Sequence, residues 1–376
     1  MKKALLITSV ALFLFTMCST KTPENKAVTE TLAIVDKQAT PETAELLKNL
    51  KENSKTGFMF GHQDALSYGL GWKYAQKPGK CDVYDVAGDY PGIFGWDLGH
   101  IEIGMPENLD SVNFDEIRSN IIKAHAFGAV NTVSWHPKNP VTDGNTWDKS
   151  QTVKHILVGG SHHAKYKEWL TILGNYFKSI KTADGKLVPI VWRPYHEHNG
   201  GWFWWGNDST SVDEYVSLWK YTVHYLRDSM QVHNLLWAYS PNLFQNKEEY
   251  LAKYPGDDYV DILGCDVYDL PQYNINYKEV APKNIAILKE LGKEKDKVYA
   301  FTETGYCSIP NEKWWTESLL PAINSSGVAW VLVWRNAHLD HFFAPYPGQK
   351  SADDFKTFYN NPQSLFANDV KLLNSK

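Results

Sequence analysis

Eight short apolar runs alternate with longer amphipathic stretches from residue 57 onward. The runs are mostly continuous in apolar character, which is typical of strands that are buried on both faces of a parallel sheet. Polar, charged or aromatic residues follow at the end of each run. The runs span residues 57–64, 90–99, 128–137, 187–197, 234–242, 260–269, 297–305 and 327–336.

The stretches between the runs have the periodicity of helices. Apolar residues recur at intervals of three and four over residues 166–180 and again over 212–226, which places them on one buried stripe. The second stretch opens with Ser211 and, three residues later, Glu214, a capping-box pattern. Eight strands alternating with helices predict a single (β/α)8 TIM barrel over residues 41–376. An open doubly wound sheet is disfavoured, because GHQDALSYG (61–69) is not a Gly-rich phosphate turn.

The N-terminal residues have the pattern of an export signal. Two lysines precede an apolar stretch over residues 4–17, which is too short to span a bilayer comfortably and ends at Cys18. We expect a signal peptide over residues 1–18, a polar tether over 19–40, and an exported, periplasmic protein. Whether Cys18 carries a lipid anchor stays open, because no small residue stands just before it.

Composition narrows the classes of function. With 38 basic and 43 acidic residues, the chain lacks the basic excess of a nucleic-acid-binding protein. Its 15 Trp, 21 Tyr and 16 Phe mostly suit a core, but those beside Gly, Asn and His in loops suit stacking on sugar rings. Cys81, Cys265 and Cys307 have no disulfide or zinc spacing.

The barrel predicts where the chemistry lies, because the active sites of such barrels lie at the C-terminal ends of the strands. Only two glutamates occupy such ends, Glu197 on the fourth strand and Glu303 on the seventh. These strands face each other across the barrel mouth, so the two carboxyl groups could flank one glycosidic bond. The alternative is that one of them pairs with Arg193 in a structural ion network. The aspartates at Asp97, Asp266, Asp269 and Asp340 are expected to cap or to hydrogen-bond.

A metal site is the competing interpretation of the His196-Glu197-His198 segment. The segment lacks the H-E-x-x-H spacing, although both imidazoles could point the same way on a strand, with His136 as a third ligand. We expect neither a metal nor a cofactor. Two glycines after the segment, Gly200 and Gly201, are expected to adopt backbone angles that other residues resist.

Four stretches resemble glycoside hydrolase family 26, whose best-known members are β-mannanases. They are RPYHEHNGGWFWWG (193–206), FTETG (301–305), GDYPGIFGWDLGHIE (88–102) and SWHPKNPV (134–141), and the matches run in order from about residue 57 to 337. The resemblance implies a retaining enzyme that cleaves β-1,4-mannosidic bonds in mannan, galactomannan or glucomannan, internally or by releasing mannobiose. The alternatives are a β-glucanase or β-1,3-xylanase on the same barrel, or a non-catalytic carbohydrate-binding barrel. The expected partner is β-mannan or a manno-oligosaccharide, bound by a monomer.

The resemblance also implies roles for individual residues. Glu197 would be the general acid and base, and Glu303 the nucleophile, which Arg193 and Tyr268 would keep ionised. At least one of Trp204 and Trp205 is expected to pack beneath the loop. The residues expected to contact sugar are His136 and His196 near the cleaved bond, Trp202 and Trp334 as stacking platforms, Arg335 deeper on the glycone side, and Trp147 on the leaving-group side, with a role as loop anchor equally open for Trp147.

Overall fold

The structure is a computed structural model, and it describes residues 33–74, 77 and 79–374 of the chain. The expected signal peptide, Cys18 and the first part of the expected tether lie outside the described residues. Among the described residues, no helix has both the length and the apolar character needed to cross a membrane.

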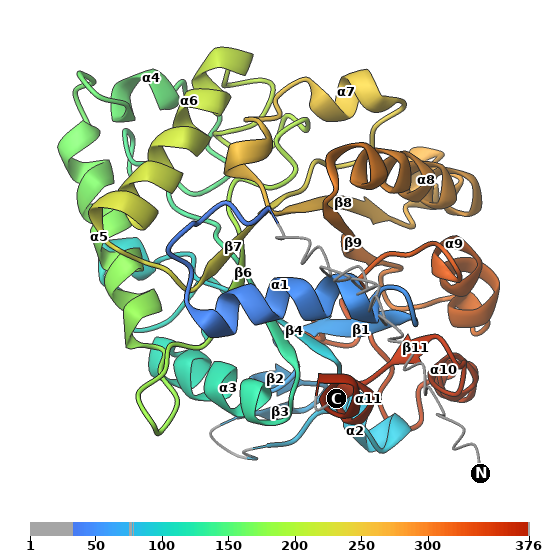
Figure 1. Cartoon of the computed structure of the whole chain (residues 1–376). Coiled ribbons are helices and arrows are strands. Elements are labelled where there is room, and N and C mark those ends of the chain that lie inside the picture. Colours follow the sequence, from blue (N-terminus) through green and yellow to red (C-terminus); the bar gives the residue numbers. More distant parts are fainter. Residues whose placement is uncertain (1–32, 75–76, 78, 375–376) are drawn as a thin grey trace, which may run out of the picture. The chain divides into compact units, whose positions relative to one another are not determined.

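Eight parallel strands form a closed barrel, which confirms the predicted (β/α)8 fold (Figure 1). Each strand pairs with the next one along the chain, and the last pairs with the first through Met59–Trp330 and His62–Val333. Every barrel strand lies inside one of the eight apolar runs. In chain order they are β1 (Phe58–Gln63), β4 (Ile93–Asp97), β5 (Val130–Ser134), β6 (Ile190–Arg193), β7 (Leu235–Tyr239), β8 (Ile262–Tyr268), β9 (Val298–Gly305) and β10 (Trp330–Val333).

Three short strands lie outside the barrel. The loop after β1 folds into a hairpin of β2 (Tyr68–Gly69) and β3 (Trp72–Lys73), and β11 (Ser364–Leu365) pairs with the amino end of β1.

Helices surround the strands (Figure 1). The capping box predicted at Ser211 is present at the start of α6 (Val212–Val223). The Ser211 side chain accepts from Glu214 N, and the Glu214 side chain accepts from Ser211 N. The helices are α1 (Pro41–Asn53), α2 (Asp82–Ala87), α3 (Phe114–Ala126), α4 (Val153–Ile156), α5 (His163–Ser179), α6 (Val212–Val223), α7 (Lys247–Leu251), α8 (Tyr277–Lys295), α9 (Leu320–Ile323), α10 (Ala352–Tyr359) and α11 (Ala367–Asn374), with short 3-10 turns at Ile101–Ile103, Asp257–Tyr259 and Pro271–Tyr273 and π-helical segments at His224–Ser229 and Trp315–Leu319.

The folded part begins before residue 41, so the predicted boundary of the tether is wrong for residues 33–40. Val35 N donates to Asp261 Oδ1 over 2.7 Å, and Asp36 Oδ2 lies 2.7 Å from His233 Nδ1. Asp261 and His233 precede β8 and β7, so this segment packs at the amino ends of those strands, opposite the end that carries the predicted site. The polar composition concealed this docking, because backbone and aspartate contacts hold the segment.

Candidate active site

A bulge in β9 sets the direction of Glu303. Cys265 on β8 pairs with Phe301, whereas the next residue, Asp266, pairs with Glu303, so Thr302 is the extra residue on β9. Its hydroxyl donates to Cys265 O over 2.9 Å and to Asp266 Oδ1 over 2.7 Å, which fixes the irregularity. Bulges of this kind re-aim side chains beside active sites.

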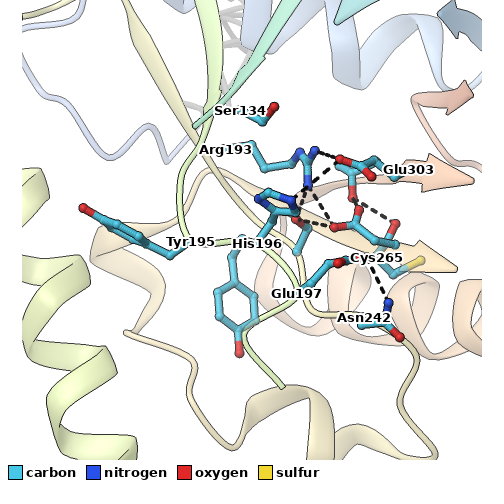
Figure 2. A network of polar contacts seen from close by, with 12 residues as sticks. Ser134, Arg193, Tyr195, His196, Glu197, Asn242, Cys265 and Glu303 are labelled. Atoms are coloured by element: carbon cyan, nitrogen blue, oxygen red, sulfur yellow. Dashed lines mark hydrogen bonds and ion pairs between the residues drawn. The ribbon is translucent and has the colours of Figure 1, made fainter. Parts of the chain in front are cut away.

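Arg193 at the end of β6 joins the carboxylates of Glu303 and Asp266. Its Nη1 donates to Asp266 Oδ2 over 2.8 Å. Its Nη2 donates to Glu303 Oε1 (Figure 2). The second oxygen of Glu303 accepts from the Tyr268 hydroxyl over 2.7 Å, the contact expected for that tyrosine. Arg193, Asp266 and Glu303 are all buried, so one guanidinium bridges two carboxyl groups inside the barrel mouth. Burial and the charges of Glu303 and Glu197 raise the pKa of Asp266 well above its ordinary value, although Arg193 lowers it. A guanidinium and a phenol hydroxyl together stabilise the negative charge on Glu303.

The chain leaves β6 through two strained residues. Tyr195 and Glu197 have φ angles of 49° and 52°, a region that costs a non-glycine residue about 1–2 kcal/mol. Contacts on both sides hold them there: Tyr215 Oη donates to Tyr195 O over 2.9 Å, and Glu197 N donates to Ser240 O over 2.8 Å. Strain of this kind is common at functional sites.

The prediction for Gly200 and Gly201 is wrong, because neither has a positive φ. Glycine at these positions leaves space for neighbouring side chains. A Cβ on Gly200 would lie 2.3 Å from the Trp202 ring, and a Cβ on Gly201 would lie 2.5 Å from Asp208 Oδ2. The absent side chain of Gly200 lets Trp202 fold back over the loop toward Glu197.

Glu197 has neutral donors instead of a cation. Asn242 Nδ2 donates to Oε1 and Trp202 Nε1 donates to Oε2, each over 2.9 Å (Figure 2 shows the Asn242 contact). Burial and the nearby negative charge of Glu303 raise the pKa of Glu197 to about 7, although both donors act in the opposite direction. A carboxyl with this pKa is protonated in a large fraction of molecules near neutral pH, as a general acid must be.

His136 is held by a carboxylate. Its Nδ1 lies 2.6 Å from Asp97 Oδ2, and Asp97 also accepts from Ser134 Oγ and Gly99 N. Burial alone would lower the pKa of His136, but Asp97 outweighs it and raises that pKa above its ordinary value. Asp97 therefore hydrogen-bonds, as expected for the competing acids, and it fixes the ring that was predicted to bind sugar.

The two histidines around Glu197 point to different partners. His196 Nε2 lies 4.0 Å from Glu303 Oε1, whereas His198 Nε2 lies 2.9 Å from Tyr239 Oη. Burial, Arg193 and His136 hold the pKa of His196 well below its ordinary range, so its ring is neutral. No group of three or more His, Cys, Asp or Glu side chains in the described part of the chain is placed to hold a metal ion.

Aromatic rings lie around Glu197 and His136. Trp202 and Trp147 have exposed fractions of 38% and 50%, and the Trp147 ring is stacked 6.2 Å from that of His136. The Trp334 ring is partly buried, with its centroid 6.3 Å from that of His136. Trp204 and Trp205 are both fully buried and donate to Pro137 O and His196 O, which confirms the expected packing beneath the loop.

Arg335 follows β10 and contacts the loops after β1 and β4. Its Nη1 lies 3.0 Å from Asp110 Oδ1 and 3.4 Å from the Tyr68 hydroxyl. These three residues line a cavity of about 690 Å³ together with the β2–β3 hairpin. The long loops after the first two strands therefore build a wall beside Arg335.

Sequence reasoning did not assign a role to Asn242 or to Tyr68. Asn242 stands at the end of the fifth barrel strand, β7, and position alone could have marked it as a candidate. Tyr68 lies in a hairpin, and only the folded structure brings its hydroxyl to Arg335.

A partly buried acid with a pKa of about 7 and a second carboxylate bound by arginine and tyrosine define the class of glycoside hydrolase that uses two carboxyl groups. Residues 35–307 match the profile of glycosyl hydrolase family 26. The chain is 33% identical over 359 residues to a mannan endo-1,4-β-mannosidase of Bifidobacterium adolescentis, covering 89% of this chain and 35% of the relative. The chain belongs to glycosyl hydrolase family 26.

Solved structures are similar along most of the barrel. A family 26 β-mannanase from Bacteroides ovatus is 46% identical with a TM-score of 0.84, covering 87% of this chain and 95% of that one. The catalytic domain of an endo-β-1,4-mannanase from Bacillus sp. JAMB-750 is 33% identical with a TM-score of 0.84, covering 91% and 95%. Among sequence relatives, this chain spans about a third of the length of the Bifidobacterium protein and 60% of a Bacillus subtilis mannan endo-1,4-β-mannosidase.

Proposed function

We propose that the protein is a retaining glycoside hydrolase that cleaves internal β-1,4-mannosidic bonds in mannan, galactomannan or glucomannan. The observation that carries the proposal is the contrast between two neighbouring carboxyl groups. Glu197 has a pKa of about 7 and can donate a proton, whereas Glu303 is bound by Arg193 and Tyr268 as an anion suited to attack. The relatives named as β-mannanases support mannan as the substrate.

The reaction proceeds in two displacements. Glu197 donates its proton to the glycosidic oxygen while Glu303 Oε attacks the anomeric carbon, so the bond to the leaving sugar breaks and a glycosyl–enzyme ester forms. The ionised Glu197 then takes a proton from water, and the resulting hydroxide displaces Glu303 at the same carbon. Two inversions give net retention of configuration.

Neighbouring residues prepare both carboxyl groups for these steps. Tyr268 and Arg193 hold Glu303 in one orientation, and His196 presents a neutral ring beside it. Trp202 serves Glu197 and sugar at once, because its Nε1 holds the acid while its exposed ring face can stack on a pyranose. His136, Trp147, Trp334 and Arg335 complete the set of expected sugar contacts.

Incubation of the full chain with mannan, glucomannan, lichenan and β-1,3-xylan, followed by product chromatography, tests substrate choice. We expect manno-oligosaccharides of mixed length from mannan and glucomannan in the first minutes. Early dominance of mannobiose would contradict endo action. Preferred cleavage of lichenan or xylan would mean that the substrate is a β-glucan or a β-1,3-xylan and not mannan. Absence of reducing sugar from every polymer would favour a carbohydrate-binding barrel. Proton NMR of the first product distinguishes retention from inversion.

The same proposal includes export and a monomeric state. The support for export is the sequence alone: two lysines, the apolar stretch over residues 4–17 and Cys18. Periplasmic location predicts recovery of the protein in an osmotic-shock fraction, and a lipid anchor on Cys18 predicts recovery in membranes instead. Labelling with a palmitate analogue, compared with a Cys18→Ala variant, decides between them. Light scattering of the purified protein tests whether it is a monomer.

A further inference from the structure

The cavity beside Arg335 is bordered by a tight turn at the end of β1. Asp64 follows the strand with φ of 53°, and its carbonyl accepts from Ser67 N over 2.8 Å and from Tyr68 N over 3.4 Å. Aspartate is one of the few residues that tolerates this left-handed region. The turn brings Tyr68 back over the Asp64 carboxyl, so two side chains four residues apart meet.

The Asp64 carboxyl is fully buried and makes a single side-chain contact. Its Oδ2 accepts from the Tyr68 hydroxyl over 2.8 Å, and its Oδ1 has no hydrogen-bond partner among the described residues. The Tyr68 oxygen in turn accepts from Arg335 Nη1. We propose that Asp64 is a positioning residue that holds Arg335 through Tyr68, so that the guanidinium presents a fixed edge to a sugar in the cavity. This inference rests on the proposed function.

The contacts of Arg335 show which edge it would present. Asp110 and Tyr68 both meet Nη1, whereas Nη2 has no hydrogen bond or ion pair with the residues that the structure describes. Two contacts on one nitrogen fix the plane of the guanidinium without using its other donors. Sugar hydroxyls are suitable acceptors for those donors.

Charge in this corner favours a neutral Asp64. Burial and the charge of Asp110 raise the pKa of Asp64 well above its ordinary value, against the opposing effects of Tyr68 and Arg335, and Asp97 acts in the same direction as Asp110. Asp110 then supplies the counter-charge to Arg335, and Asp64 supplies a neutral acceptor. An asparagine at position 64 keeps both the acceptor and the left-handed backbone, whereas a glycine keeps only the backbone.

The experiment compares Asp64→Gly, Asp64→Asn and Tyr68→Phe with the wild-type protein on mannotetraose. We expect KM to rise about tenfold in Asp64→Gly and Tyr68→Phe with kcat changed less than about twofold, because the loss affects binding of a charged donor and not the two glutamates. Asp64→Asn should stay within about twofold of wild type in both constants. The double variant Asp64→Gly/Tyr68→Phe should match either single variant, since both interrupt one chain of contacts.

Two control variants separate positioning from structure. Asp296→Gly replaces an exposed aspartate with φ of 50° at the end of α8, and Tyr176→Phe removes a buried hydroxyl that donates to Phe114 O. Both should keep wild-type KM. An unchanged KM in Tyr68→Phe would overturn the proposal even if Asp64→Gly failed to fold. Equal KM values for Asp64→Asn and Asp64→Gly would also overturn it, since the charge and not the acceptor would then matter. Absence of wild-type turnover would instead contradict the proposed function.

Discussion

The two glutamates lie in the same barrel mouth, yet their surroundings differ in kind. Glu303 is on a strand, and a guanidinium and a phenol hydroxyl bind its two oxygens. Glu197 is on a strained strand exit, where an amide and an indole bind its oxygens. The Arg193 cation stabilises the negative charge of Glu303. For Glu197, the neutral donors only partly offset the rise in pKa that burial causes. Identical side chains thus receive opposite roles from their neighbours.

The neighbour that makes the difference is Arg193. It forms contacts with Glu303 and Asp266 but none with Glu197, although it precedes Glu197 by only four residues. A strand directs alternate side chains to opposite faces, and the turn through Tyr195 re-aims the next residues. Substitution of each carboxyl group, and of a hydrogen-bond donor to each, tests this difference.

Removal of the nucleophile should have the largest effect. We expect Glu303→Ala to lower kcat on mannan by about 10⁴-fold or more, because no other group can form the covalent intermediate. Steady-state rates on mannan measure this, with circular dichroism as the check on folding. A folded variant with near wild-type activity would disprove the assignment. Asp269→Asn, which changes an acid outside the pair, serves as the control.

Removal of the acid should have a smaller and more selective effect. We expect Glu197→Ala to lower kcat on mannan by about 10²–10⁴-fold, since this is the range that general acid catalysis supplies. A substrate whose leaving group needs no protonation, such as a dinitrophenyl β-mannobioside, should retain a fast first step. Burst kinetics with that substrate measure this. An equal loss on both substrates would mean that Glu197 is not the acid.

Removal of one hydrogen-bond donor to Glu303 should lower kcat less than removal of either carboxyl group. Tyr268→Phe removes the bond to Oε2 and leaves Arg193 in place, so we expect kcat to fall about 10–100-fold, the cost of one hydrogen bond to a charged group. KM and kcat on mannotetraose separate orientation from binding. If KM rises while kcat stays constant, Tyr268 binds sugar and does not orient the nucleophile.

The smallest effect should come from a donor to Glu197, and it should appear in the pH profile. The enzyme needs this acid protonated, so kcat/KM should fall as pH rises through about 7. Asn242 lowers the pKa of Glu197, so Asn242→Ala should raise it and move the basic limb upward by about half a pH unit. A downward shift, or none, would contradict the assigned donor. Asn246→Ala, at the start of α7, is the control.

The amino-acid pattern predicted the barrel and the strand ends well. Buried parallel strands require continuous apolar runs, and the ends of those runs place Glu303 on the seventh strand and Glu197 at the exit of the fourth. The contact of Tyr268 with Glu303 follows from the family resemblance, and it is present in the structure together with that of Arg193. Residues 33–40 were misjudged, since a polar segment can dock through backbone contacts that leave no apolar signal.

Only the tertiary structure decided the finer features of the site. The backbone strain falls on Tyr195 and Glu197 and not on Gly200 or Gly201, which instead leave room for Trp202 and Asp208. The divergence of His196 and His198, the donor role of Asn242 and the contact of Tyr68 with Arg335 were likewise invisible in the chain. Sequence determined which residues reach the barrel mouth, because periodicity sets strands and their ends. The fold decided what each residue does there, because pKa values and hydrogen bonds depend on neighbours that are distant along the chain.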